Sequence, residues 1–532
     1  MQNKKHRSRL VTSILASMVA ISAMSQTSGE RPQLVVKIMI DQLRGDYIEL
    51  LQDYFGEAGF KRLISKGACF ENLYFNIDKV DIVSGTAMIV TGTYPRINGL
   101  TAEHVYDVHK RIEQDILTDP TKMGNFTSEK LSPKALKVST VSDELKINGD
   151  GFGCVYSIAP DAQQAIILAG HAGNGAFWIN DVNGKWSTTT YYTDVPKAIT
   201  NRNYKNSLTT RIDTMSWVPM MQSSNYPCVS SHKKFYPFKH TFPASRVDRY
   251  ATYKRSALVN EEVTSMTLDL LASIELGNRG ETDMLSIGYS LAPYSNELGD
   301  GSVELQDKYL RLDHQLGRLF DAIDSKVGLD KTLVVVSSTG YYSENVSVKE
   351  IYNIPSGQFS PVKAKSLLNL YLMAVYGNAQ WVADYQNESF YLDHKVVKAK
   401  NVDIKEMRKK ASDFLRRMSG VEESYSVDDI IDNPLGESAK KIQRGLIASH
   451  VGDVIIKVMP GWGIIEHEGT PRKNVKHIRS SVVASPAYIM HPSVKAQKIT
   501  IPVDATILAP TVSRLLRIRS PNAAYGKPYI LE

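Results

Sequence analysis

The chain has 532 residues, of which 42% are hydrophobic and 22% are charged, so it has the composition of a globular protein and is long enough for several domains or one large one. The formal net charge is +7; removing the four basic residues of the first 26 positions leaves 59 basic against 56 acidic groups, or about +3. Such a balance excludes the strongly basic surface typical of nucleic-acid-binding proteins. The three cysteines, Cys69, Cys154 and Cys228, lie far apart, which excludes a disulfide framework and a thiolate metal site but leaves one bridge open.

The amino terminus has the pattern of a secretory signal peptide. Four basic residues between Lys4 and Arg9 precede an apolar segment at 10–24, and small residues follow. We expect cleavage near Ser25 and Gln26, which makes 1–25 the signal peptide. The segment is too short for a permanent membrane anchor, so the mature protein is expected to be exported to the periplasm or cell envelope with no transmembrane segment.

The first element of the mature chain is an apolar run, Leu34 to Asp41, that stops at a carboxylate. A run of this kind predicts a strand buried on both faces, in a parallel sheet covered by helices. Asp41 would then lie at the carboxyl edge, where open α/β sheets bind ligands. The alternative is that Asp41 caps a helix starting near Gly45.

The next elements alternate helices and strands. Helices are expected from Tyr47, over 59–67, and from Ser84 to the glycine stop at Gly92. Short strands are expected at 154–159 and 165–169, followed by an irregular excursion over about 173–250. A strand at 283–290, a long helix over 305–323 and a strand at 332–337 form a predicted βαβ unit.

The last third of the chain is more polar. We expect a strand at 368–376, a polar helical insertion over about 379–452, strands at 453–458 and 481–490, and a closing helix at 505–518. The predicted fold is a three-layer αβα domain, mostly parallel, spanning 26–532 with the two insertions over its carboxyl edge.

The order of motifs resembles the alkaline phosphatase superfamily, and most closely its threonine-nucleophile phosphatases, which are related to nucleotide pyrophosphatases and phosphodiesterases. The match is collinear over nearly the whole mature chain. The segments that carry it are Asp41-Gln42-Leu43-Arg44, Ser84 to Pro95, Ala169-Gly170-His171 with Gly175-Ala176-Phe177-Trp178, and Ala509-Pro510-Thr511 through Gly526-Lys527-Pro528.

For an active member, the resemblance implies two zinc ions held by carboxylates and histidines, and a threonine that attacks phosphorus. Here the nucleophile position is Ile82, which has no nucleophilic atom. Of the metal-ligand positions, only Asp41 keeps its residue type, and Arg472 has no lone pair to give a metal. The other ligand positions are Gly288, Ala292, Ser338 and Thr339, and the phosphate-contact positions are Glu103, Ala162 and Gln164.

These replacements favour a catalytically inactive member of the superfamily, with no catalytic residue, no metal and no cofactor. Such a protein would act as a binding, accessory or scaffold component of the envelope, with an unknown envelope protein or ligand as partner and no nucleic acid. Its vestigial pocket would contain Asp41, Glu103 and Arg472. Because an unpaired buried carboxylate is costly, Arg472 is expected to compensate Asp41.

The alternative is a zinc-dependent phosphomonoesterase or phosphodiesterase, or a sulfatase-like hydrolase, with a divergent site. Ser84 or Thr86 could replace the nucleophile, although a hydroxyl needs a base or metal to react and Ser84 suits a helix cap. A relocated metal site would draw on the remaining histidines and on nearby acids, although His171 is expected to be structural. The histidines and acids concerned are His104, His109, His171, His450, His467, His477, Glu103, Asp107, Glu466 and Glu468.

Overall fold

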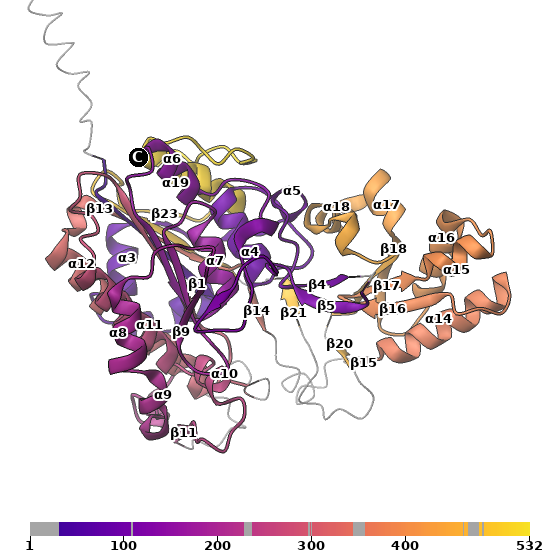
Figure 1. Ribbon diagram of the computed structural model, residues 1–532, viewed down its shortest axis with the longest axis horizontal. Coiled ribbons are helices and arrows are strands. Elements are labelled where there is room, and N and C mark those ends of the chain that lie inside the picture. The colour runs from indigo at the N-terminus through magenta and orange to yellow at the C-terminus, as the bar shows by residue number, and fades with distance from the viewer. Residues whose placement is uncertain are drawn as a thin grey trace, which may run out of the picture.

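The computed structural model describes residues 31–107, 110–227, 237–295, 298, 301–343, 357–460, 462–465, 478–480 and 484–531. A ten-stranded sheet forms the centre of the larger lobe (Figure 1). Its strand order is β23-β2-β22-β13-β1-β12-β7-β8-β9-β6. These strands are β1 (Leu34–Asp41), β2 (Ala68–Phe70), β6 (Gly124–Asn125), β7 (Val155–Ala159), β8 (Gly175–Ile179), β9 (Trp186–Thr189), β12 (Asp283–Ser290), β13 (Thr332–Ser338), β22 (Ala487–Met490) and β23 (Gln497–Ile499).

The centre of the sheet is parallel, as the sequence predicts. β1 pairs in parallel with β12 and β13, and β12, β7 and β8 continue the parallel order. Towards the margins β22 and β9 pair antiparallel with their neighbours. The register places Asp41 opposite Ser290 and places Ile40 opposite Ser338, so all three strand ends meet at one edge.

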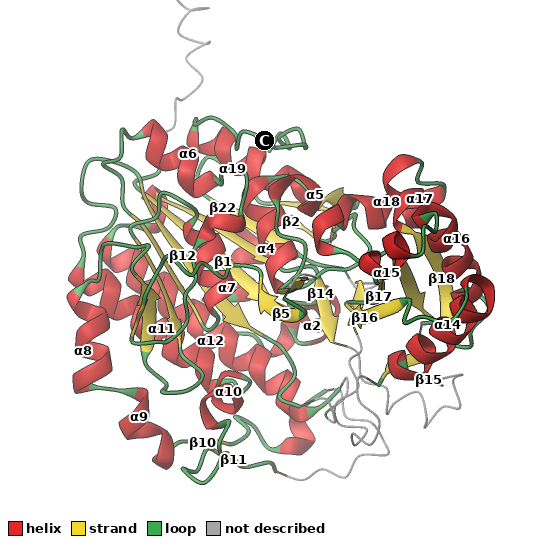
Figure 2. Cartoon of the chain, turned by 45° about the vertical axis from the view of Figure 1, so that its right-hand side comes forward, coloured by secondary structure: helices red, strands yellow, loops and turns green. Residues whose placement is uncertain are grey.

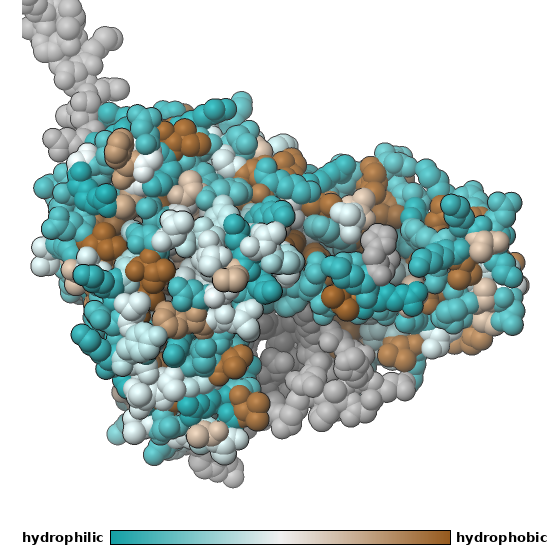
Figure 3. All heavy atoms as spheres, viewed as in Figure 1, coloured by the Kyte–Doolittle hydropathy of each residue, from teal (hydrophilic) through white to brown (hydrophobic). Residues whose placement is uncertain are grey.

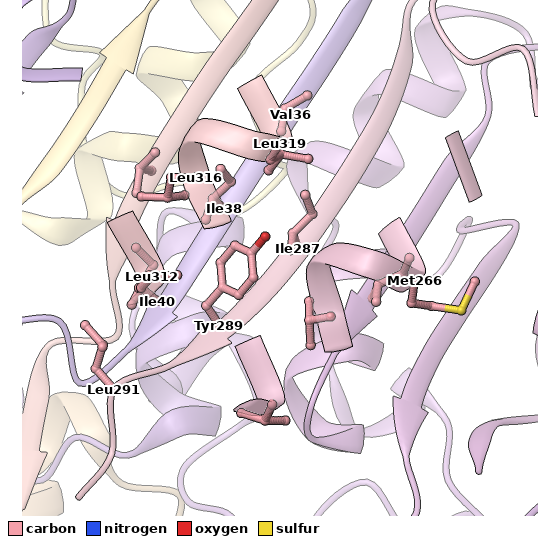
Figure 4. Packing of buried hydrophobic residues seen from close by; sticks show 14 of the residues in the cluster. Val36, Ile38, Ile40, Met266, Ile287, Tyr289, Leu291, Leu312, Leu316 and Leu319 are labelled. Carbon is pink, nitrogen blue, oxygen red and sulfur yellow. The ribbon is translucent and has the colours of Figure 1, made fainter. Parts of the chain in front are cut away.

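Helices cover both faces of the sheet, which confirms the three-layer architecture. Alternate residues of β1 enter two different apolar cores: Val36, Ile38 and Ile40 face one side, and Val35 and Met39 face the other. Figure 4 shows the first side, where the β1 residues lie against leucines of α12 (Val303–Lys326). The other helices of this layer include α10 (Arg249–Lys254) and α11 (Leu258–Ser273), and the opposite layer contains α4 (Ile82–Thr91), α6 (Val141–Asn148), α7 (Ala162–Ala169) and α19 (Leu508–Leu516).

A second, smaller lobe is formed by residues 357–464 (Figure 2). It packs its own apolar core, which includes Trp381 and Phe390, and it touches the larger lobe through the ring of Tyr391, 5.0 Å from that of Tyr106. Its four-stranded antiparallel sheet has the order β16-β17-β19-β18. Its elements are α14 (Pro361–Tyr376), β16 (Val382–Gln386), β17 (Ser389–Leu392), α15 (His394–Ala399), α16 (Ile404–Leu415), β18 (Val421–Ser426), α17 (Val427–Asp432), α18 (Gly436–Gly445) and β19 (Val454–Val458).

Several local predictions were wrong. Residues 165–169 belong to α7 and residues 368–376 to α14; both are helical. A short apolar run does not distinguish a buried strand from a buried helix by its periodicity, and the capping signals that decide these cases, such as Ser360 and Pro361, lie upstream. The predicted excursion contributes β8 and β9 to the main sheet, and the predicted polar insertion contains a β-sheet. The division into one domain with insertions stays a prediction.

The surface in Figure 3 is mostly hydrophilic, with apolar residues in small scattered groups. Within the described part of the chain, no helix is long and apolar enough to cross a membrane. The predicted signal peptide lies outside the described residues, as does Cys228, while Cys69 and Cys154 are both free thiols.

Candidate functional site

Asp41 lies at the carboxyl end of β1, with 5% of its surface exposed. Its Oδ1 accepts a hydrogen bond of 3.0 Å from the hydroxyl of Thr339, and the Tyr341 hydroxyl also donates to the carboxylate. Asp41 does not cap α2 (Gly45–Leu50), whose N-cap position is Arg44. The alternative reading of Asp41 as a helix cap is therefore wrong.

Burial and polar contacts act in opposite directions on the pKa of the Asp41 carboxyl. Burial raises the pKa of its carboxyl to about 6, against the opposing effect of the Tyr341 and Thr339 hydroxyls. The negative charge of Asp161 raises the pKa further, whereas the ammonium of Lys308 lowers it. Among the described residues, Lys308 is thus a cation whose charge acts on Asp41.

Two further acids lie in the same neighbourhood. Besides burial, the negative charges of Asp41, Asp81 and Glu103 raise the pKa of the Tyr341 hydroxyl, so all three are close to this tyrosine. Asp81 caps α4 and also accepts a hydrogen bond of 2.7 Å from the backbone N–H of Glu103. The structure therefore places Asp41, Glu103 and Asp81 around the Tyr341 hydroxyl.

Burial raises the pKa of Glu103 to about 7. The positive charge of His104 works against this increase, and the negative charges of Asp81, Asp161 and Asp115 add to it. The cluster is consequently rich in negative charge, and Glu103 stays protonated to a higher pH in the folded chain than in the unfolded one.

We expect Glu103→Gln to stabilise the protein above neutral pH. Because the folded pKa of Glu103 exceeds its ordinary value of 4.5, the wild type loses stability as pH rises from about 4.5 to about 7. Glutamine removes this loss, and after allowance for partial exposure the gain near pH 8 is about 1–2 kcal/mol. Urea unfolding of both proteins near pH 8 and pH 4 measures it, with equal stabilities expected at the lower pH. A variant that is less stable than the wild type near pH 8 would contradict the assignment.

Two lysines lie near these acids; burial lowers the pKa of one of them, Lys308, to about 7, and the negative charge of Asp41 opposes this decrease. Lys308 is fully buried in α12, and its Nζ donates hydrogen bonds to the backbone carbonyls of Ala292 (2.5 Å) and Arg255 (3.1 Å). Lys254 forms ion pairs with Asp161 at 2.6 Å and with Asp181 at 2.7 Å. Neither lysine was identified as a site residue from the sequence. The sequence does contain a signal that could have identified Lys308: this charged residue falls between Leu305 and Leu312 on the apolar face of the predicted helix.

The positions that the resemblance assigns to metal ligands carry other groups. Gly288 lies in β12, and a Cβ atom there would be 2.0 Å from Oε1 of Gln164. The Ser338 hydroxyl donates to the backbone carbonyl of Leu43 at 2.8 Å. Ala292 offers only its backbone carbonyl to Lys308. Arg472 lies outside the described residues, so its predicted pairing with Asp41 stays a prediction.

The remaining predicted positions are also placed by the structure. Ile82 is the first residue of α4, and Ala162 and Gln164 lie in the first turn of α7. The helix starts two residues earlier than predicted, with Asp81 as its N-cap, and Ser84 takes part in the capping box as the third helical residue, accepting from the Asp81 N–H and donating to its carboxylate. Thr86 is fully buried within α4.

The histidines of the described chain do not assemble a metal centre. His171 is bonded to Asp143 Oδ2 and to the Leu136 carbonyl, each at 2.9 Å, in agreement with its expected structural role. His450 contacts the Thr101 hydroxyl at 3.2 Å. In the part of the chain that the structure describes, no three His, Cys, Asp or Glu side chains converge on one point, so these residues do not fit a pair of zinc ions. His109, Glu466, His467, Glu468 and His477 lie outside the described residues.

Comparison with known proteins identifies relatives over almost the whole chain. The family model described as Type I phosphodiesterase / nucleotide pyrophosphatase matches residues 35–481. Alkaline phosphatase PafA of Elizabethkingia meningoseptica is 27% identical over 96% of both chains, and alkaline phosphatase PhoV of Synechococcus elongatus is 27% identical over 93% of this chain and 92% of its own. The crystal structure of wild-type PafA superimposes with a TM-score of 0.82, at 26% identity, covering 94% of this chain and 98% of that one.

These findings overturn the expectation of a catalytically inactive binding or scaffold protein. The relatives are named alkaline phosphatases and match over nearly the full length, and nothing in the described residues shows inactivity. The expectation was wrong because it equated the replacement of the family residues with the loss of the reaction, although other groups can serve a diverged site. The chain, with its αβα fold and Asp41 at the carboxyl edge of the sheet, belongs to the Type I phosphodiesterase / nucleotide pyrophosphatase family and, with it, to the alkaline phosphatase superfamily.

Proposed function

We propose that this protein is an exported hydrolase of phosphate esters with a diverged site at the carboxyl edge of β1, β12 and β13. The observation that carries the proposal is the match to the phosphatase and phosphodiesterase family over 35–481, together with the superposition on PafA. Asp41 keeps both its residue type and its place at the edge where such folds bind their ligands. Export follows from the signal-peptide pattern of the first 25 residues.

The charge of the site favours phosphodiesters over phosphomonoesters. A monoester carries close to two negative charges at neutral pH, whereas a diester carries one. The phosphate-contact positions here are Glu103, Ala162 and Gln164, so no cation stands at any of them, and Asp81 adds negative charge beside Glu103. Repulsion grows with the charge of the ligand, and because Glu103 is fully ionised only above its pKa of about 7, the site discriminates against the dianion most strongly at alkaline pH.

The chain's own residues give the site its polarity. Asp41 is held in place by the hydroxyls of Thr339 and Tyr341, and the ammonium of Lys308 lies within electrostatic range of it. Asp41, Thr339 and Lys308 are buried and Tyr341 is partly buried, so the fold sets their orientation before a ligand enters. Because the described residues do not fit a zinc pair, no step of the reaction is assigned to a metal.

Hydrolysis of three aryl esters tests the proposal. The purified mature protein is assayed on bis(p-nitrophenyl) phosphate, p-nitrophenyl phosphate and p-nitrophenyl sulfate, with added zinc and with a chelator. We expect turnover of the diester with a higher kcat/KM than that of the monoester, and its loss in Asp41→Asn but not in Asp53→Asn, a control on the surface of the same lobe. Mass analysis of the mature amino terminus checks the signal cleavage.

Absence of turnover on the phosphate esters under both conditions would refute the proposed function. A preference for the monoester would refute the charge argument alone. Turnover restricted to the aryl sulfate would instead assign the protein to sulfate esters.

A further inference from the structure

We propose that Lys308 supplies, from within the protein, the positive charge beside Asp41 that the resemblance assigns to a metal ion. The proposal goes beyond the proposed function, because it concerns the cation at Asp41 and not the ester that is hydrolysed. Three features of the described residues support it.

The first feature is the way Lys308 is fixed. Its side chain is fully buried, and its Nζ donates to two backbone carbonyls, those of Ala292 and Arg255. Ala292 directly follows the β12 end that lies beside Asp41, since the N–H of Leu291 donates to the Asp41 carbonyl at 2.9 Å. The amino group is therefore anchored next to the carboxyl end of β1, on the backbone carbonyl of Ala292, the residue at which the resemblance would place a histidine ligand.

The second feature is that neighbouring side chains occupy the volume at Gly288, where the resemblance places another metal ligand. A side chain at Gly288 would begin 2.0 Å from Oε1 of Gln164 and 2.6 Å from Cβ of Ala159. Gln164 itself is 1% exposed, so it has little free volume to move into. The carboxylate that would complete a metal site with Asp41 is absent, and the protein interior occupies its volume.

The third feature is the set of groups around the Asp41 carboxylate. The hydroxyls of Thr339 and Tyr341 donate to it, and the charge of Lys308 acts on it. In return, the charge of Asp41 opposes the burial that lowers the pKa of Lys308 to about 7. Removing a carboxylate from water is costly unless donors and a counter-charge replace the solvent. Hydroxyls and an ammonium meet both needs without a metal.

Metal analysis and thermal unfolding provide the first test. The full-length mature protein is produced with zinc in the medium, and its zinc content and melting temperature are measured before and after treatment with a chelator. We expect substoichiometric zinc and an unchanged melting temperature. Stoichiometric zinc whose removal lowers the melting temperature would overturn the proposal, whatever the outcome of the hydrolysis assay.

A double-mutant cycle provides the second test. Lys308→Met and Asp41→Asn are each expected to lower the melting temperature, because each leaves the other charge without its counter-charge, and the double variant is expected to recover part of the loss. Lys37→Met is the matched control: Lys37 is also buried and lies on the same strand as Asp41, but it contacts Ser142 and the Leu168 carbonyl.

Combined with Asp41→Asn, the control substitution should be additive. Additivity of the Lys308 and Asp41 substitutions would overturn the proposal, as would a Lys308→Met variant as stable as the wild type. If Lys308→Met does not fold alone but folds together with Asp41→Asn, the rescue itself supports the pairing.

Discussion

Replacing Gly85 with alanine is expected to lower the free energy of unfolding by about 3 kcal/mol or more. Gly85 lies in the first half of α4, where the helix crosses the chain just after β13. A Cβ atom there would be 2.1 Å from the carbonyl oxygen of Thr339 and 3.1 Å from its carbonyl carbon. Both are backbone atoms, which no rotamer change can move away, so the helix or the strand end must shift.

The shift would also reach the site. Thr339 donates its hydroxyl to Asp41, so moving its backbone weakens the contact that orients the carboxylate. We therefore expect the Gly85→Ala variant to lose activity on the aryl diester at temperatures where it is still folded. Urea unfolding and kcat/KM measured on the same preparation separate the two effects.

Gly445→Ala is the matched control. Gly445 is also helical, at the end of α18, and a Cβ there meets only Ile77 at the ordinary distance of 3.6 Å. Alanine is favoured over glycine in a helix by up to about 1 kcal/mol, so this variant should be as stable as the wild type or slightly more so. Equal stability of the two variants would contradict the close approach of α4 to Thr339.

The strands of the sheet centre could be predicted because both of their faces are buried. Such strands are continuous apolar runs, and a long amphipathic helix between β12 and β13 identified them as a βαβ unit. The helices α7 and α14 were predicted as strands because short apolar stretches satisfy both patterns. Within the strands of the smaller lobe, buried residues are interspersed with exposed polar ones, and the pairing of these strands is set by tertiary contacts.

From the residues alone, only those parts of the candidate site could be predicted whose position follows from the predicted sheet. Asp41 could be placed at the carboxyl edge because the strand ends there, and Glu103 was placed near it by the resemblance alone. Lys308 could not be placed, because its distance from Asp41 depends on how α12 packs across the sheet. The filling of the Gly288 position by Gln164 is likewise a matter of packing between α7 and β12. Residue identities at aligned positions show what has been lost, but not what has replaced it.

The Asp307→Asn variant is expected to be less stable than the wild type by about 3–5 kcal/mol. Asp307 is fully buried on α12, and its two oxygens accept four hydrogen bonds. The donors are Trp217 Nε1 (2.6 Å), the Met220 N–H (2.7 Å), the Tyr226 hydroxyl (2.7 Å) and Arg311 Nε (2.8 Å). Asparagine keeps the size of the side chain but offers one acceptor oxygen, so its amide nitrogen must face donors.

We expect the loss of stability to appear first in the segment that these four hydrogen bonds attach to α12. Residues 215–226 have little regular structure, and Asp307 ties three of them to the long helix. We expect the backbone amides of 215–226 to lose their protection from hydrogen exchange at a lower urea concentration in the variant than in the wild type, while those of the sheet centre open only in the main transition.

Asp321→Asn on the same helix is the control. Asp321 is largely exposed and pairs with Arg62 at 3.2 Å, so the same change of atoms should cost less than about 1 kcal/mol. If the two variants lose equal stability, the four hydrogen bonds do not account for the anchoring. A large difference would show that α12 fixes the outer segment through the buried carboxylate of Asp307.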